Sequence, residues 1–286
     1  MTAPHTHRLG NLDLQILSDG LFYQDAGAVF GLVPRVMWER AAHPELDDQH
    51  RMALGLNCVL VRSGDKLVLI ETGVGDKAGQ RRQASPAGEG TLLAALASLD
   101  VRPEQIDIVI NTHLHADHCG WNTRANEEGA PVPTFPRARY LIQRGEWEAA
   151  THPSERTRAT YLADNLLPLE EAGVLELIDG ERTVTPEITL LPTPGHTEEH
   201  ASVVLTSGGE TAIYIGDLVQ HHVQLERTAW VSAFDVLPLV SMETKKRIVE
   251  RAIRERALIV SVHSPFPGLG RLTKSEDGRK HWEPLP

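Results

Sequence analysis

The chain has little cysteine, few aromatic side chains and a deficit of positive charge. Cysteine occurs only at positions 58 and 119 of 286, which excludes a disulfide framework and a Cys-x-x-Cys metal knuckle. Lysine and arginine number 28 against 39 acidic residues, and this formal charge of -11 argues against a nucleic-acid surface and against attraction to anionic lipid. No apolar run approaches the ~20 residues of a membrane span, and the N-terminus lacks a signal-peptide pattern. We therefore expect a soluble cytoplasmic protein with a small neutral substrate and no nucleic-acid or membrane partner.

The first half of the chain contains patterns of both strands and helices. Apolar residues that alternate with polar ones, or that form short β-branched runs, predict strands at 12–17, 58–61, 67–71 and 106–110. A Ser-Gly-Asp turn joins the second and third of these strands into a hairpin. Thr91 is expected to cap a helix over 92–99, whose leucines follow the helical period. Two polar helices are expected at 143–150 and 155–162, separated by Pro153.

The second half repeats the order of hairpin, helix and strand. The hairpin is expected at 201–206 and 212–216, the helix at 241–256 and the strand at 258–262. No Ser/Gly-rich or Pro-rich linker separates the halves, so we expect a single domain over 1–286. Two similar halves, each with a sheet to bury and helices to cover it, predict an α/β fold of two facing sheets with helices outside.

Potential metal ligands are concentrated directly after the predicted strand 106–110. Four of them fall within six residues, and they are His113, His115, Asp117 and His118. A strand that ends in a tight loop can turn several side chains to one point, and imidazole and carboxylate are donors that zinc accepts. One local cluster cannot complete the coordination of two metals. Further donors are expected where other strands end, at His196, Asp217 and His263.

With these residues the sequence resembles the metallo-β-lactamase superfamily. The resemblance rests on His-x-His-x-Asp-His at 113–118, followed in the same order by the three later donors, and covers about residues 55–270. It implies an αββα sandwich with two mixed sheets. It also implies that His113, His115 and His196 bind a first metal and that Asp117, His118 and His263 bind a second, with Asp217 bridging them. Zinc is favoured because histidine predominates, with iron, cobalt or manganese as alternatives.

Flanking segments resemble the branch that contains quorum-quenching lactonases and methyl parathion hydrolases. These segments are 27–34, Ala229-Trp230, Asp235 with Pro238-Leu239, and 263–268. Two departures stand out. The best-known lactonases carry a tyrosine three positions after the bridging aspartate, where this chain has Gln220, and this leaves the oxyanion donor open among Gln220, His221 and His222. The usual Asp-Thr-Gly after the first hairpin is Glu-Thr-Gly at 71–73, which implies a changed hydrogen bond behind the ligands.

The resemblance implies a dinuclear hydrolase. Two dications held ~3.5 to 4 Å apart lower the pKa of a shared water to near neutrality, so that the bridging hydroxide is the expected nucleophile. Asp117 and Asp217 are the expected catalytic carboxylates, and Asp117 can carry a proton to the leaving alkoxide. The favoured reaction is the opening of small lactones, above all N-acyl-homoserine lactones. Phosphotriester hydrolysis of the methyl-parathion-hydrolase type and a catalytically idle metal-binding or ligand-sensing module are the alternatives.

The substrate pocket is expected to have an apolar wall with few polar groups. Aromatic residues close in sequence to the ligand loops are the candidates for this wall, and they are Phe30, Trp121, Trp230, Phe234 and Phe266. The N-terminal segment 1–55 is expected to contribute a strand. Its apolar stretch at 30–38 is expected to cap the pocket or to make the contact of a homodimer.

Overall fold

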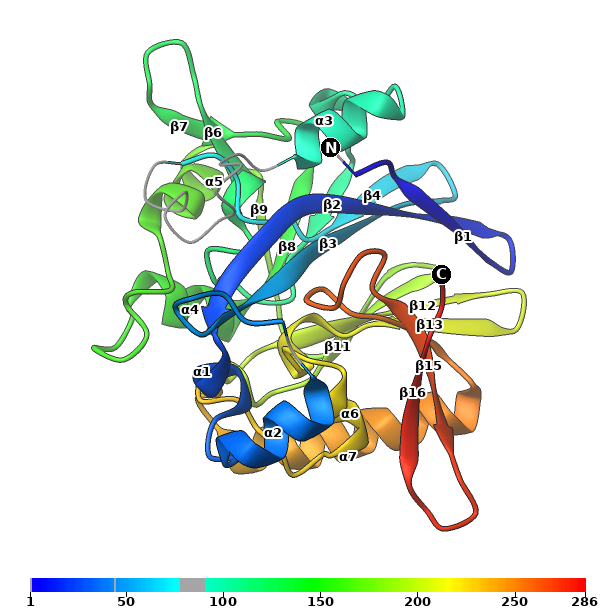
Figure 1. The fold of residues 1–286 in the computed structure, drawn as a ribbon. Coiled ribbons are helices and arrows are strands. Elements are labelled where there is room, and N and C mark those ends of the chain that lie inside the picture. Colours follow the sequence, from blue (N-terminus) through cyan, green and yellow to red (C-terminus); the bar gives the residue numbers. More distant parts are fainter. Residues whose placement is uncertain (1, 44, 78–90) are drawn as a thin grey trace.

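Two seven-stranded sheets lie face to face in the computed structural model, which describes residues 2–43, 45–77 and 91–286 (Figure 1). The first sheet has the strand order β1 (His5–Leu9), β2 (Leu12–Asp25), β3 (Arg51–Ser63), β4 (Lys66–Ile70), β5 (Ile108–Ile110), β8 (Arg139–Gln143) and β9 (Leu175–Ile178). The second has the order β10 (Arg182–Thr185), β11 (Ile188–Pro192), β12 (Ala201–Ser207), β13 (Glu210–Tyr214), β14 (Leu258–Val260), β15 (Leu269–Lys274) and β16 (Lys280–Pro284). A small separate hairpin is formed by β6 (Thr123–Ala125) and β7 (Pro131–Pro133).

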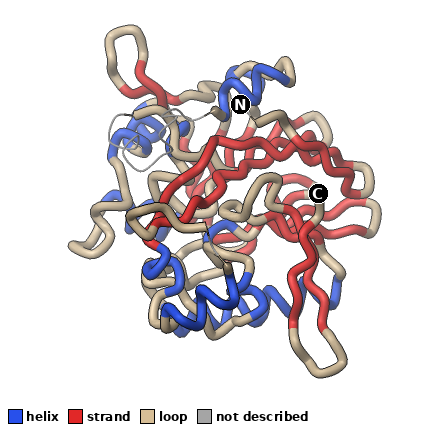
Figure 2. Tube along the Cα trace, in the orientation of Figure 1, coloured by secondary structure: helices blue, strands red, loops and turns tan. Residues whose placement is uncertain are grey.

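Helices cover the outer faces of both sheets (Figure 2). The first sheet carries α3 (Leu92–Ser98), α4 (Arg144–Thr151) and α5 (Leu167–Glu171). The second carries α7 (Pro238–Glu255), with the short α6 (Val223–Glu226) at one end. Near α6 and α7 lie α1 (Ala26–Phe30) and α2 (Arg35–Ala42), which leave the first sheet between β2 and β3 (Figure 1). This arrangement confirms the predicted αββα sandwich.

The strands are apolar on both faces because each face packs against a different layer. In β3, Val59 and Val61 enter the core between the sheets, whereas Cys58 and Leu60 pack with the helices outside. The same alternation divides β13, where Tyr214 faces the second sheet's inner core and Ile213 faces α7. Burial on both faces explains why these strands read as continuous apolar runs in the sequence.

Parallel pairing brings the functional loops to one edge. Strands β4, β5, β8 and β9 pair in parallel in the first sheet, and β13 pairs in parallel with β14 in the second. Parallel neighbours need crossover connections and therefore end at the same side of a sheet. The loops after β5, β13 and β14 carry most of the predicted ligands, and the fold gathers them there.

The structure corrects two predicted local features. Residues 155–160 form turns and 161–162 have no regular structure, where a helix was expected, because the Ser154 backbone N–H donates to the Thr157 hydroxyl and the Thr160 hydroxyl donates to the Thr157 carbonyl. Such local bonds compete with the helical ladder. Thr91 does not cap α3 with its side chain, since its hydroxyl donates to the Ser18 carbonyl. The carboxylate of Asp19 instead accepts the first N–H of α3, from the neighbouring strand.

No helix among the described residues combines the length and the apolar character that a membrane crossing needs. The N-terminal segment supplies two antiparallel strands, β1 and β2, and the beginning of β3, where the sequence predicts one strand. It therefore forms the edge of the first sheet.

Candidate metal centre

The loop after β5 turns its ligand candidates into the protein. His113 and His118 are fully buried, His115 is 8% exposed and Asp117 is partly exposed. The turn closes because the backbone N–H of His118 donates to the carbonyl of His115 across 3.0 Å. The buried carboxylate of Glu146, in α4, accepts the N–H of Leu114 across 2.9 Å. The loop is thus held by its own turn and by a helix on the outer face.

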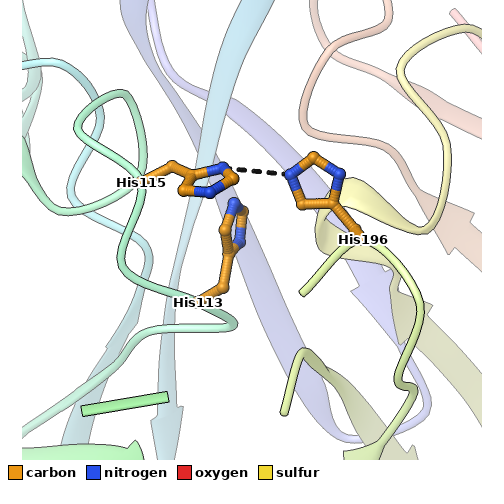
Figure 3. A group of neighbouring side chains, drawn as sticks. All are labelled: His113, His115 and His196. Carbon is orange, nitrogen blue, oxygen red and sulfur yellow. Dashed lines mark hydrogen bonds between the residues drawn. The ribbon is translucent and has the colours of Figure 1, made fainter. Parts of the chain in front are cut away.

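One group of nitrogens joins this loop to the loop after β11 (Figure 3). The ligand atoms of His113, His115 and His196 all lie within 4.8 Å of one another. Nε2 of His196 and Nδ1 of His115 are 3.0 Å apart. The three residues that the resemblance assigns to the first metal therefore meet at one point.

A second group lies beside the first. It consists of Asp117, His118 and His263, with Oδ2 of Asp117 3.5 Å from Nε2 of His118 and 3.7 Å from Nε2 of His263. His263 reaches this place from the end of β14, in the other sheet. The donors assigned to the second metal are thus also within ligand distance of a common centre.

Asp217 stands between the two groups and offers one oxygen to each. Its Oδ2 lies 3.2 Å from Nε2 of His196 and 4.0 Å from Nε2 of His113. Its Oδ1 lies 3.1 Å from Nε2 of His118 and 2.9 Å from Nε2 of His263. This is the placement that a bridging carboxylate requires.

The chemistry of the cluster fits divalent cations. Within the described part of the chain, Nε2 of His113, Nε2 of His118 and Oδ1 of Asp217 are buried without a hydrogen bond. Buried polar atoms rarely stay unsatisfied, and metal ions bound by the two groups would satisfy all three. Burial holds the pKa of His113 and of His115 well below the ordinary value, which keeps the neutral imidazole that a metal binds. Against the effect of burial, His263 and His118 hold the pKa of Asp217 well below its usual range, so this carboxylate is ionised.

Hydrogen bonds on the far side of the rings orient three of the histidines. Nδ1 of His196 lies 3.0 Å from Oδ1 of Asp235, and Nδ1 of His263 lies 2.9 Å from the Gly55 carbonyl. Nδ1 of His113 lies 3.1 Å from the neighbouring Thr112 hydroxyl. Such partners leave Nε2 of each ring for the metal and fix the ring's orientation.

Glu71, the departure from the usual aspartate, also lies behind the ligands. Its backbone has the left-handed φ of 64°, which is uncommon for a residue other than glycine. One carboxylate oxygen accepts the N–H of Thr112 across 2.8 Å, and the other lies 3.6 Å from Nδ1 of His118. The longer glutamate thus supports the start of the ligand loop and faces one of its histidines.

His200 belongs to the site although sequence reasoning did not single it out. It is fully buried, and its Nε2 accepts the backbone N–H of Asp217 across 3.0 Å. Burial lowers its pKa to about 3, which keeps the ring neutral and able to accept this bond. A Cβ atom on Gly216 would lie 2.6 Å from that nitrogen, so the close approach needs glycine there. The only signal in the sequence is a second histidine four positions after His196.

A cavity of about 340 Å³ opens above the cluster. The ligands at its base are His115, Asp117, His196, Asp217 and His263. Its walls are formed by Phe22, Gln24, Leu54, Ala116, Arg156, Thr157, Ala159, Thr160, Gln220, Ala233, Phe234 and Val236. The turns at 155–160, where the sequence predicted a helix, therefore form one wall.

Of the five aromatic residues predicted for the pocket wall, the structure places only Phe234 there. Phe30 is buried between Trp38 and Trp230, and Trp121 donates its indole N–H to Asp19. Phe266 packs against the core between the sheets. These four side chains find apolar surroundings away from the cavity, which is where aromatic rings are stable in any case.

Only one of the three candidates for the oxyanion donor lines the cavity. Gln220 lines the cavity, with Nε2 3.4 Å from Oδ2 of Asp217. His221 and His222 do not line it. The ring of His221 packs against Phe30 and accepts a backbone N–H, while the ring of His222 stacks on Trp282. The stretch 30–38 does not line the cavity either, and Leu32 and Val36 within it are exposed.

Known proteins resemble this chain in sequence and in fold. An N-acyl homoserine lactonase of Bacillus cereus is 26% identical over 243 residues, which are 80% of this chain and 89% of that protein. A probable metal-dependent hydrolase from Staphylococcus aureus has the same fold, with a TM-score of 0.86 at 23% identity over 98% of this chain and 99% of the other. AidC, described as a dizinc quorum-quenching lactonase and solved with a product, has a TM-score of 0.82 at 22% identity over 99% and 98%.

The strongest assignment comes from the family comparison, because it spans both halves of the sandwich. The sequence model of the metallo-beta-lactamase superfamily matches residues 52–263, a range that begins in β3 and ends at the ligand candidate His263. All seven ligand candidates lie inside this range. The chain belongs to the metallo-beta-lactamase superfamily.

Proposed function

We propose that this protein is a dinuclear metal-dependent hydrolase that opens small lactones, with N-acyl-homoserine lactones as the favoured substrates and zinc as the favoured metal. The observation that carries the proposal is the position of Asp217, whose two oxygens face two separate ligand groups. The lactonase relatives support the choice of substrate class. The preponderance of histidine among the ligands supports zinc.

The candidate ligands form two metal-binding groups that share Asp217. His113, His115 and His196 would bind one ion, Asp117, His118 and His263 the other, and Asp217 both. Two divalent ions bound there would polarise the substrate's carbonyl and lower the pKa of a shared water molecule. The protein contributes the fixed geometry, through bonds such as that between His196 and Asp235.

Gln220 is placed to stabilise the charge that develops on the carbonyl oxygen. Its amide Nε2 is 3.3 Å from Nδ1 of His196 and faces the cavity beside Asp217. Oε1 of Gln224 accepts the backbone N–H groups of Gln220 and of His221, each across 3.0 Å, and so holds this loop. An amide donor held beside the reacting carbonyl takes the role of the missing tyrosine.

Asp117 is the group that can move a proton. It is partly exposed at the base of the cavity, unlike the other carboxylate of the cluster. Opening a lactone releases an alkoxide that must be protonated. We assign this transfer to Asp117.

Phe22, Leu54 and Phe234 give the cavity an apolar wall for the acyl chain.

The test is hydrolysis of N-hexanoyl-L-homoserine lactone by the zinc-loaded protein, with a dimethyl aryl phosphotriester assayed beside it. We expect lactone opening to dominate, and we expect Asp217→Asn to lower it by at least a hundredfold together with the bound metal. Preferential triester cleavage would assign the phosphotriesterase activity instead. Two bound metals per chain without turnover of either substrate would contradict an enzymatic role and favour a sensing module.

A further inference from the structure

Arg156 occupies a position in the cavity wall that the proposed reaction does not use. The described residues that line the cavity include no other lysine or arginine. The only carboxylates among them, Asp117 and Asp217, belong to the ligand cluster at the base. The chain as a whole carries a formal charge of -11. Against this excess of acidic residues, the single arginine gives the wall of the substrate cavity a local positive charge.

The guanidinium of Arg156 is only partly engaged. One Nη2–H donates to the carbonyl of Ala233 across 2.7 Å, which links the wall formed by the turns at 155–160 to the wall formed by Ala233 and its neighbours. Arg156 is exposed and makes no ion pair among the described residues. A guanidinium has five N–H donors in a planar fork, so most of them remain available to a ligand.

The walls of the cavity restrict what such a ligand can be. Its other polar side chains are neutral, on Gln24, Thr157, Thr160 and Gln220, and the remaining lining is apolar. A substrate that fits has a hydrolysable carbonyl at the cluster, an apolar middle part and an oxygen acceptor where the guanidinium stands. A carbonyl or a carboxylate is such an acceptor.

We propose that Arg156 determines specificity by binding an oxygen acceptor on the acyl chain of the substrate, so that acyl lactones carrying a second carbonyl or a carboxylate are preferred. This inference rests on the proposed function. The bond to Ala233 holds the guanidinium in place before the substrate enters. The turns at 155–160, which carry Arg156, are held beside the ligand loop because the N–H of Ala116 donates to the Thr160 carbonyl across 2.9 Å.

The experiment compares three lactones that differ only in the acyl chain. They are N-hexanoyl-, N-(3-oxohexanoyl)- and N-(5-carboxypentanoyl)-L-homoserine lactone, and kcat/KM is measured for each with the wild type, Arg156→Gln and Arg156→Lys. We expect Arg156→Gln to lower kcat/KM for one acceptor-bearing lactone about tenfold relative to the hexanoyl lactone. The lactone affected shows whether the acceptor is the 3-oxo carbonyl or the terminal carboxylate. Arg156→Lys retains the charge and should recover part of the preference.

Arg158→Gln is the matched control, because Arg158 is an exposed cation of the same turns that does not line the cavity. It should leave the ratios between lactones unchanged. If Arg156 only held the two walls together, Arg156→Gln would slow all three lactones equally, and the inference would be wrong.

A binding measurement separates this inference from the proposed function. Titration calorimetry of the metal-loaded protein with the three ring-opened N-acyl-homoserines needs no turnover. Tighter binding of an acceptor-bearing compound, lost in Arg156→Gln, supports the role of Arg156 even if no lactone is hydrolysed. Equal affinities in the wild type would overturn it even if lactones are opened rapidly.

Discussion

Oδ1 of Asp235 lies 3.0 Å from Nδ1 of His196, on a ring whose other nitrogen faces the ligand cluster. Oδ2 of the same carboxylate accepts the hydroxyl of Ser241 across 2.5 Å. Ser241 belongs to α7, on the outer face of the second sheet. The orientation of one candidate metal ligand is therefore set by a helix on the outer face of the second sheet, through two hydrogen bonds.

Replacing Asp235 should weaken the metal site without removing a ligand. We expect Asp235→Asn to reduce metal affinity about 10- to 100-fold, because the amide no longer stabilises the His196 ring as the carboxylate does. Competition with a chromogenic chelator measures the change. Ser241→Ala, which leaves the carboxylate in place, should have a smaller effect. Equal affinities of wild type and Asp235→Asn would show that the pair does not support binding.

Removal of metal should destabilise the fold. A ligand that binds only the native state adds RT ln(1 + [L]/Kd), which is about 2.7 kcal/mol when the free metal concentration is 100 times Kd. In this cluster, removal also leaves His113 Nε2 and Asp217 Oδ1 buried without a hydrogen bond. We expect calorimetry to show a lower Tm after chelation and recovery when zinc is restored. An unchanged Tm would contradict the proposed metal centre.

Gln220 should affect the chemical step more than substrate binding. We expect Gln220→Leu to lower kcat for lactone opening about 100-fold with little change in KM, since a donor to the developing oxyanion acts mainly in the transition state. His221→Gln alters a neighbour whose ring faces Phe30 and not the cavity, and it should leave kcat within about twofold. A change confined to KM would assign Gln220 to ground-state binding.

His221 should make stability depend on pH. Burial and the neighbouring His222 lower the pKa of His221 to about 3, whereas in the unfolded chain it is about 6.5. Between pH 6.5 and pH 3 the unfolded state therefore binds a proton that the folded state does not bind. The contribution of His221 to the free energy of unfolding is thus complete above pH 6.5 and is lost as the pH falls. From pH 6.5 to 5, the residue should account for about 2 kcal/mol of lost unfolding free energy.

Urea unfolding of wild type and His221→Gln at both pH values measures this contribution. The loss on acidification should be smaller in the variant, and the control His281→Gln, at an exposed position of β16, should lose as much as the wild type. Parallel losses in all three proteins would rule out the role of His221.

Asp19, in β2, should be a determinant of stability. Its Oδ1 accepts N–H groups of Leu92 and Trp121, and its Oδ2 accepts those of Val74 and Gly75, at 2.8 to 3.0 Å. In Asp19→Asn, the amide N–H groups would replace one of these oxygens and face two of the N–H donors. We expect this variant to lower the free energy of unfolding, measured with urea, by about 3 kcal/mol. Asp13→Asn, at an exposed ion pair with Arg8, should change stability by less than about 1 kcal/mol.

The layered fold was accessible from the sequence, and the sequence also names the candidate metal ligands, because both depend on short-range pattern. The apolar run of 106–110 and the hairpins at 58–71 and 201–216 become buried strands wherever two layers cover them. His113, His115 and His118 share one loop, so a single turn brings them together. Asp217 and His263 follow the ends of β13 and β14, and the parallel pairing of these two strands places their ends along one edge.

The tertiary structure alone decided which other side chains meet the cluster. Asp235 and His196 are separated by 39 residues, and nothing in the local sequence pairs them. Phe234 lines the cavity while Trp121 does not, because any buried surface stabilises an aromatic ring and only packing selects the surface. The turns at 155–160 replaced a predicted helix through local side-chain bonds, and in doing so they brought Arg156 to the cavity wall. Sequence periodicity indicates which residues become buried, but the residues that they contact depend on how distant segments pack.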